Sequence, residues 1–394
     1  MARPHRPHLD AVMREGERVL PLELFFDLVF VLALTQCTAY LAEHTTWTGL
    51  AQALLILGML WWSWVGYSWL TSVINPEEGA VRIAIFVAMA GFLISSLCIP
   101  EAFDDLGLLF ACAYAVVRIA HIALFAIASR EDAALRRSVI GLAVSTAIGT
   151  SLLVVASFTD DGLQIGIWAL ALFLDAGGPY VYGADGWKIQ PGHFAERHAL
   201  IIIIALGESI VAIGAGASAT VDTGVVVAAI LGIAVAAAFW WMYFDVVALV
   251  AERRLQNAEP GREQNEIARD SFSYLHFPMV AGIVLVALGM KKTLGHVEDP
   301  LKLIPAVGML GGSAVYLFAH VAFRWRNVHR FSPHRLATGV LLLALIPVGV
   351  EVDSIVTLAT LAAILIALIV YEYVRFAELR KDLRARLHSD AVHE

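Results

Sequence analysis

Charged residues are scarce in this chain of 394 residues, since Asp, Glu, Lys and Arg make up 16% of it, against about 25% in an ordinary soluble domain. Basic residues are the minority among them, with 27 Lys and Arg against 35 Asp and Glu. This balance provides no basic field to attract nucleic acid. The sequence also lacks a GxxxxGK[ST] loop, which argues against ATP bound by this chain as the source of energy.

Cysteine is rare as well. Cys37, Cys98 and Cys112 each lie in an apolar run, and the sequence contains no CxxC motif or Cys/His cluster. This spacing argues against a disulfide framework and against structural zinc, so we expect three packed cysteines, no metal site and no cofactor. The first 18 residues are polar, and we expect no cleavable signal there.

Apolar residues are abundant: 59% of the chain is hydrophobic and the mean hydropathy is +0.74. A helix that crosses a hydrocarbon core about 30 Å thick needs about 20 such residues in a row. The sequence therefore predicts an all-α, polytopic transmembrane helical bundle with about twelve spans, of which the last two are separated only by "EVDS". The predicted spans are residues 20–42, 49–72, 80–99, 106–128, 138–158, 163–183, 199–218, 223–250, 271–290, 301–323, 334–350 and 353–375.

The distribution of Lys and Arg predicts the orientation, because cytoplasmic loops collect these residues. If the N-terminus is on the cytoplasmic side, the outer segments contain only three basic residues, Lys291, Lys292 and Lys302. Nearly all other basic residues then lie in cytoplasmic segments. They include Arg3, Arg6 and Arg14 near the N-terminus and Arg380, Lys381, Arg384 and Arg386 near the C-terminus. We therefore expect both termini on the cytoplasmic side. The remaining base, Arg118, lies inside the fourth predicted span.

An internal repeat is indicated by landmarks that recur in the same order. "FFDLVFVLA" in the first span aligns with "LGESIVAIG" in the seventh, and a double Trp and a His recur in later spans. The aligned residues are Asp27 with Glu208, Trp61 and Trp62 with Trp240 and Trp241, and His121 with His320. The sequence thus predicts a 6+6 parallel duplication, with repeats at residues 1–187 and 188–394.

Ionisable side chains inside the spans are the candidate functional residues, because a charge at the bilayer centre costs roughly 2.5 to 3.5 kcal/mol on insertion scales. Either they form a fixed network that holds the helices in register, or some of them titrate or bind a ligand. In both cases we expect Arg118 to pair with a buried acid, which is Glu23, Asp27 or another one; Glu23 and Asp27 are the nearest by chemistry. The candidates for binding a proton or substrate are Glu23, Asp27, Arg118, His121, Glu208, Asp245 and His320.

Aromatic residues supply further candidates. Each of them either packs in the protein interior or lines a cavity. They are the four aligned tryptophans, Trp61, Trp62, Trp240 and Trp241, together with Tyr114 and Tyr316. Asp175 precedes "AGGPY", which predicts a break in the sixth helix. We expect His276 to have a structural role near a helix start.

Two stretches carry a family resemblance. "PLELFFDLVFVLALTQ" and "HFAERHALIIIIALGESIVAIG" resemble the hallmarks of the bacterial low temperature requirement A family. The resemblance implies a polytopic protein of the bacterial inner membrane, and it brings no reaction with it. The matching positions are Glu23, Phe26, Asp27, Glu196, Arg197, Gly207, Glu208 and Ser209.

Three functional hypotheses follow. The first is a secondary transporter of a small solute, with proton coupling as one possible source of energy for transport. The second is a membrane redox protein whose His121 and His320 ligate a haem. The third is a non-catalytic scaffold, or a protein that interacts with membrane lipids, in cold adaptation. No enzymatic activity is assigned, and the expected partners are membrane lipids and an unidentified solute.

Overall fold

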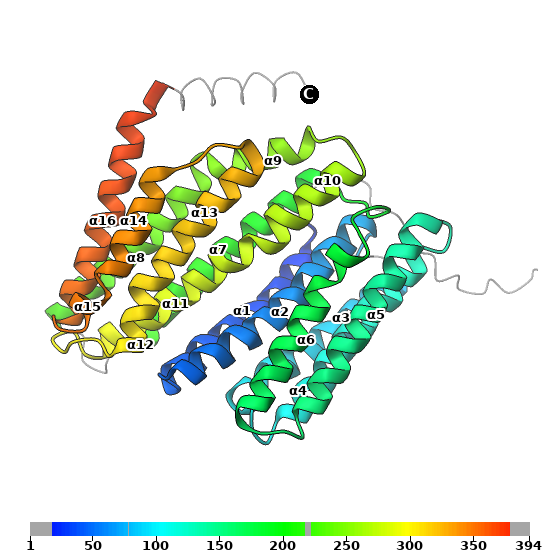
Figure 1. The fold of residues 1–394 in the computed structure, drawn as a ribbon, viewed down its shortest axis with the longest axis horizontal. Coiled ribbons are helices and arrows are strands. Elements are labelled where there is room, and N and C mark those ends of the chain that lie inside the picture. Colours follow the sequence, from blue (N-terminus) through cyan, green and yellow to red (C-terminus); the bar gives the residue numbers. More distant parts are fainter. Residues whose placement is uncertain (1–17, 78, 217–221, 379–394) are drawn as a thin grey trace, which may run out of the picture.

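The computed structural model describes residues 18–77, 79–216 and 222–378, and within these ranges every regular element is helical (Figure 1). The basic residues predicted to be cytoplasmic at the two ends, Arg3, Arg6, Arg14, Arg380, Lys381, Arg384 and Arg386, lie outside the described residues. The main helices are α1 (Pro21–Glu43), α2 (Trp47–Val73), α3 (Gly79–Leu97), α4 (Gly107–Ala128), α5 (Ala133–Ala156), α6 (Asp161–Val181), α7 (Pro191–Gly216), α8 (Thr223–Phe244), α9 (Val247–Gln256), α10 (Arg262–Ile267), α11 (His276–Gly295), α12 (Leu303–Ala306), α13 (Gly312–Val328), α14 (Pro333–Ala344), α15 (Ile346–Gly349) and α16 (Ser354–Arg375). A 3₁₀ turn, Ile99–Glu101, and two π-helical segments, Ala268–Tyr274 and Val307–Gly311, complete the set.

Ten helical stretches in these ranges are long and apolar enough to cross a membrane. Helices joined by a π-helical segment are counted as one stretch, and so are α8 and α9, which are joined by a short turn. The all-α membrane fold is therefore confirmed. The two remaining predicted spans correspond to α6 and to α14 with α15, which form helices but are not among the ten. A total of twelve spans stays a prediction.

The expected break in the sixth helix is wrong, because α6 runs without interruption past Asp175 to Val181. Pro179 lies inside the helix, two residues before its end. There the missing proline N–H and the ring clash act on the carbonyl group of Asp175, four residues earlier, so they affect only the last two turns. The hydroxyl group of Tyr274 donates a hydrogen bond to the carbonyl oxygen of Ala176, near the same end of α6.

The helices fall into two groups that lie side by side in Figure 1, α1 to α6 and α7 to α16. In the first group α1 packs on α2 and α3, α3 on α4, α4 on α5 and α5 on α6. In the second group α7 packs on α8 and α11, α11 on α13, α13 on α14 and α14 on α16. The groups meet where α1 packs against α7 and α11. The first helix of each group therefore lies at the junction.

Large apolar side chains cover much of the outer surface. Ile83 is 65% exposed and Phe173 is 72% exposed, on helices from different parts of the first group. A soluble protein rarely exposes so much apolar surface, whereas lipid chains cover it without cost. Cys112 lies on this surface, so our expectation of three packed cysteines is wrong there, although Cys37 and Cys98 are buried.

The connection from α6 to α7 is tied to the start of α5. Asp132 accepts hydrogen bonds from the N–H groups of Ala134 and Leu135, both at 3.0 Å, and its carboxylate lies 2.7 Å from Nζ of Lys188. The hydrogen bond from Lys188, followed by those from the backbone, lowers the pKa of Asp132. This tie contributes stability above the ordinary pKa of an aspartate, and the contribution is lost as the pH falls through the lowered value.

A close contact between two helices of the second group depends on glycine. A Cβ atom on Gly282 of α11 would lie 2.6 Å from the carbonyl oxygen of Gly312 on α13. Gly282→Ala should force the helices apart and lower the free energy of unfolding by about 1 to 3 kcal/mol, measured by reversible unfolding in mixed micelles. Gly214→Ala is the control, because nothing lies within 4 Å of its Cβ position. Equal stability of the two variants would contradict the close packing.

Candidate functional site

Four ionisable side chains meet where α1 packs against α7. Glu23 and Asp27 are four residues apart near the start of α1, and His193 and Arg197 are four apart near the start of α7. Residues at this spacing share one helical face. All four are buried, with exposed fractions of 1% for Glu23 and Arg197 and 0% for Asp27 and His193. The two faces therefore bring two acids and two bases together out of contact with solvent.

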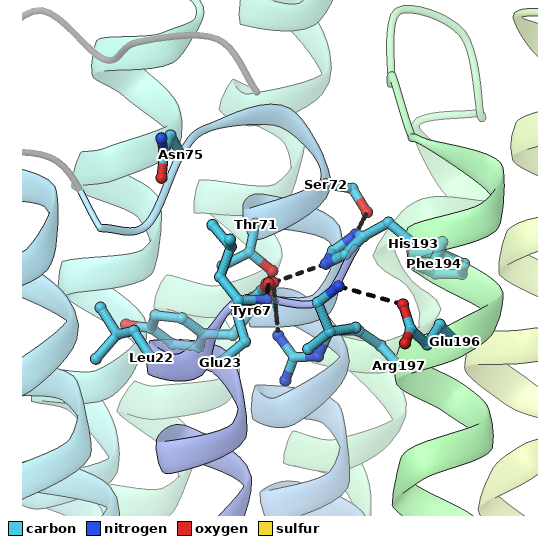
Figure 2. A network of polar contacts seen from close by, with 12 residues as sticks. Leu22, Glu23, Tyr67, Thr71, Ser72, Asn75, His193, Phe194, Glu196 and Arg197 are labelled. Atoms are coloured by element: carbon cyan, nitrogen blue, oxygen red, sulfur yellow. Dashed lines mark hydrogen bonds and ion pairs between the residues drawn. The ribbon is translucent and has the colours of Figure 1, made fainter. Parts of the chain in front are cut away.

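Glu23 links this cluster to the helix end (Figure 2). Its Oε1 atom lies 2.8 Å from Nε2 of His193 and accepts a hydrogen bond from Nη1 of Arg197 at 3.3 Å. Its Oε2 atom accepts the N–H of Leu20 at 2.8 Å. An acid at the third helical position commonly reaches back to the residue before the helix. Glu23 thus satisfies the start of α1 while it pairs with α7.

Residues near the end of α2 close the cluster from a third side. Thr71 Oγ1 accepts a hydrogen bond from Nη1 of Arg197 at 3.1 Å, and Ser72 Oγ lies 2.9 Å from Nδ1 of His193. In Figure 2 both hydroxyl groups point toward the side chains from α7. Each ring nitrogen of His193 therefore has a polar neighbour, Glu23 on one side and Ser72 on the other.

Asp27 forms the deeper part of the cluster. Its Oδ1 atom is ion-paired with Nη2 of Arg197 and accepts a hydrogen bond from Nε1 of Trp64 at 2.8 Å. The guanidinium carbon of Arg197 lies 5.4 Å from the centre of the Trp64 ring, which adds a cation–π contact. Oδ2 of Asp27 is buried and has no hydrogen-bond partner among the described residues. One oxygen of this carboxyl group thus has two partners, and the other has none among the described residues.

The charges of this cluster do not balance by themselves. Within this set of four side chains, two carboxylates, Glu23 and Asp27, face one guanidinium, Arg197, and one imidazole, His193. With a neutral imidazole the sum is one negative charge, and one bound proton makes it zero. Because an uncompensated charge in a dry interior is costly, the arrangement favours retention of one exchangeable proton.

Glu208 occupies a second position in the same helix contact. Its Oε2 atom accepts a hydrogen bond from Thr35 of α1 at 2.5 Å, and Glu208 forms no ion pair within the described ranges. Thr35 follows Asp27 by eight residues, which is about 12 Å along a helix. The two aligned acids, Asp27 and Glu208, therefore lie at the same junction without touching each other.

Arg118 pairs with a buried acid other than Glu23 and Asp27. Its Nη2 atom lies 2.8 Å from Oδ1 of Asp175 on α6, and Thr146 of α5 bridges the two, accepting from Arg118 at 2.7 Å and donating to Asp175 at 2.9 Å. Tyr114 donates to Oδ2 of Asp175 at 3.1 Å. Glu23 and Asp27, the nearest acids by chemistry, are not its partners, because α4 packs on α2, α3 and α5, whereas the acids of α1 face α7.

His121 borders a cavity of about 40 Å³ beside this network. It is 1% exposed, and neither ring nitrogen has a hydrogen-bond partner within the part of the chain that the structure describes. The cavity is also lined by Trp62, Arg118, Asn265 and Arg269. A cavity of this size has room for one or two water molecules. Such a water would satisfy the His121 ring.

His320 is paired with a different arginine. Nη1 of Arg335 lies 3.0 Å from Nδ1 of His320, and the same guanidinium makes two hydrogen bonds to Glu372, at 2.7 and 2.8 Å. The ring packs against Tyr243 and Tyr316. The ring of His121, in the other group, packs against Tyr67 and Phe125. The structure thus does not bring the two histidines together as a haem ligand pair.

Most aromatic candidates pack and two line cavities. Trp61 donates to the carbonyl oxygen of Ser273 at 2.9 Å, and Tyr316 donates to that of Phe239 at 2.8 Å. Trp240 is 45% exposed on the outer surface. Trp62 lines the small cavity, whereas Trp241 and Asp245 line a larger one of about 290 Å³ between α8, α9, α13 and α16.

His276 is the first residue of α11, as expected, and hydrogen-bonds the hydroxyl group of Tyr243 at 2.8 Å.

The partners from α7 were missed by the sequence analysis, although a signal for them was present. His193 and Arg197 have the same four-residue spacing as Glu23 and Asp27, near the start of the corresponding helix of the other repeat. Two helices that begin at the same side of the membrane can match such faces residue by residue. The sequence around Asp175 indicates a helix break and gives no sign of the pairing with Arg118. No group of three metal-binding side chains occurs within the described ranges.

The fold and these sealed networks define a polytopic helical membrane protein with ion pairs buried between its helices. Residues 18–370 match the family described as bacterial low temperature requirement A protein (LtrA), and the chain belongs to this family. A protein of Rhizobium meliloti (strain 1021), described as uncharacterized, is 30% identical over 376 residues, which cover 91% of this chain and 90% of that protein. No solved structure matches the chain.

Proposed function

We propose that the protein is a proton-coupled secondary transporter of a small solute in the bacterial inner membrane, with both termini in the cytoplasm. The observation that carries the proposal is the cluster of Glu23, Asp27, His193 and Arg197 in the contact between the two helix groups. A purely structural tie is complete with one acid for each guanidinium. The additional acid and the adjacent imidazole give this cluster a place for a proton.

The location of the cluster supports transport. Alternating access moves one group of helices against the other, with coupling groups at the contact between repeats. The same order of helix contacts in the two groups supports a 6+6 parallel repeat at residues 1–187 and 188–394, and α1 and α7 begin those repeats. Protonation that weakens the pairing of α1 with α7 would therefore loosen the contact that such motion requires.

Two acids at this junction have different surroundings, and we assign them different roles. Arg197 and Trp64 hold Asp27 as the fixed charge through two interactions with Oδ1. Glu208, bonded to the hydroxyl group of Thr35, carries a second exchangeable proton, in addition to the one that Glu23 and His193 retain in the cluster. Arg197 takes the charge-setting role for which Arg118 was expected, because Arg118 is engaged with Asp175.

The test uses the protein in proteoliposomes that contain a pH-sensitive dye. Solutes from a metabolite panel are added outside, and we expect at least one to move protons with it. Asp27→Asn and Glu208→Gln should abolish this solute-dependent signal in variants that insert and fold. Asp299→Asn is the control, since this acid is exposed at the far end of α11. If both buried variants act like wild type, the acids are structural and the proposal fails.

The scaffold hypothesis is favoured by one specific observation. In the network of Arg118 and Asp175 one acid meets one guanidinium, and Tyr114 and Thr146 supply further hydrogen bonds. That arrangement is complete without a proton and suits a fixed tie. A panel in which no solute moves protons or raises the thermal stability of the protein at two pH values would favour this second function.

A further inference from the structure

The larger cavity, about 290 Å³, is bounded by the ends of α8, α13 and α16 and by the short helix α9. Figure 1 shows α9 at the same end of the bundle as the end of α16. Apolar side chains form much of the wall, including Trp241, Val247 and Phe323. This volume accommodates a small polar group together with the first atoms of an apolar chain.

The charged side chains that line the cavity leave one positive charge in excess. They are Arg324, Arg330 and Arg335 against Asp245 and Glu372. Arg335 is engaged by Glu372 through two hydrogen bonds, and Nη1 of Arg324 donates to Ser332 Oγ at 2.9 Å. An occupant with one negative charge would balance this sum, and guanidinium groups bind phosphate oxygens with good geometry.

Asn327 adds a second, independent requirement. It lines the cavity, is 4% exposed, and donates from Nδ2 to the carbonyl oxygen of Phe323 at 2.8 Å. Its Oδ1 atom is buried and has no hydrogen-bond partner among the described residues. A buried acceptor without a donor is costly. The occupant should therefore carry a hydrogen-bond donor near its negative charge.

We propose that this cavity binds the headgroup of an anionic phospholipid whose phosphodiester carries hydroxyl groups, of the phosphatidylglycerol type. The phosphate lies among Arg324 and Arg330, a hydroxyl group donates to Oδ1 of Asn327, and the acyl chains leave along the apolar wall. Basic pockets between helices at the membrane surface suit such headgroups. This inference does not depend on transport, and it assigns a ligand to a site outside the α1–α7 junction.

The experiment measures thermal stability of the full-length protein, delipidated in a neutral detergent. Phosphatidylglycerol should raise the melting temperature at lower concentration than phosphatidylcholine, which has the same phosphodiester but neither net charge nor hydroxyl groups. In Arg330→Gln and Asn327→Leu the half-saturating concentration of phosphatidylglycerol should rise about tenfold, the factor for one lost polar contact. Arg330 is exposed, so its substitution should leave the fold intact.

Arg375→Gln is the matched control, because this exposed arginine lies at the same end of the bundle and does not line the cavity. Equal weakening by Arg375→Gln and Arg330→Gln would overturn the proposal in favour of general surface attraction. Equal stabilisation by the two lipids would also overturn it. Glycerol 3-phosphate, with inorganic phosphate as its control, shows whether the ligand is a lipid or a soluble phosphate ester. Stabilisation by phosphatidylglycerol alone identifies a lipid site. Equal stabilisation by glycerol 3-phosphate identifies a soluble ligand with the same chemistry.

Discussion

Replacement of Arg197 by methionine is expected to remove most of the folded protein. The change leaves Glu23 and Asp27 within one cluster, both buried and without their guanidinium. Breaking a buried pair by removing one partner costs about 3 to 5 kcal/mol, because the other charge is left uncompensated. The folded state of a typical domain is stabilised by about 5 to 15 kcal/mol, so this loss is a large share of the total. The measurement is the yield of monodisperse protein in detergent and the free energy of unfolding in mixed micelles.

A variant in which Glu23 and Asp27 are also neutralised separates the effect of the unbalanced charge from the effect of the altered packing. Arg197→Met combined with Glu23→Gln and Asp27→Asn should recover much of the stability, since no uncompensated charge remains. Arg136→Gln is the matched single control, because Arg136 is exposed near the start of α5. If Arg197→Met were as stable as Arg136→Gln, water would reach the cluster and it would not be a sealed ion network.

The helices themselves could be predicted from the sequence because a membrane restricts the alternatives. A backbone in hydrocarbon must satisfy its own hydrogen bonds, so a long apolar run without many charges becomes a helix. Segments such as Pro21–Glu43 and Ser354–Arg375 therefore agree closely with the predicted spans. α6 was harder, since a glycine pair and Pro179 indicate a break. The position of that proline in the last turn removes most of its effect.

The partners of buried charges could not be predicted in the same way. Chemistry requires that Arg118 has an acid, but the choice among buried acids depends on which helices touch. A span has several possible neighbours, and its apolar residues face both lipid and other helices, so the pattern does not identify the inward face. Asp175 became the partner because α4, α5 and α6 pack in succession. The π-helical segment beside His276 likewise has no sequence signal that we used.

A second large effect is expected at Asp175. Asp175→Asn keeps the size of the side chain and removes the charge, so the buried Arg118 loses its counterion. Because Arg118 is only 1% exposed, water cannot replace this counterion, and we expect the free energy of unfolding to fall by about 3 to 5 kcal/mol. Tyr114→Phe removes one hydrogen bond to the same carboxylate and should cost about 1.5 to 3 kcal/mol. Both values are measured by reversible unfolding in mixed micelles.

The double variant shows whether the effect belongs to the pair. Asp175→Asn with Arg118→Met should be more stable than Asp175→Asn alone, because removing the orphaned cation relieves the penalty that the single change creates. Added salt should not weaken the wild-type pair, since ions do not screen charges sealed between helices, whereas the exposed pair of Arg254 and Glu263 should weaken. Strictly additive losses in the double variant would show that Arg118 and Asp175 do not depend on each other. The pairing would then contribute to the position of α6 through shape alone.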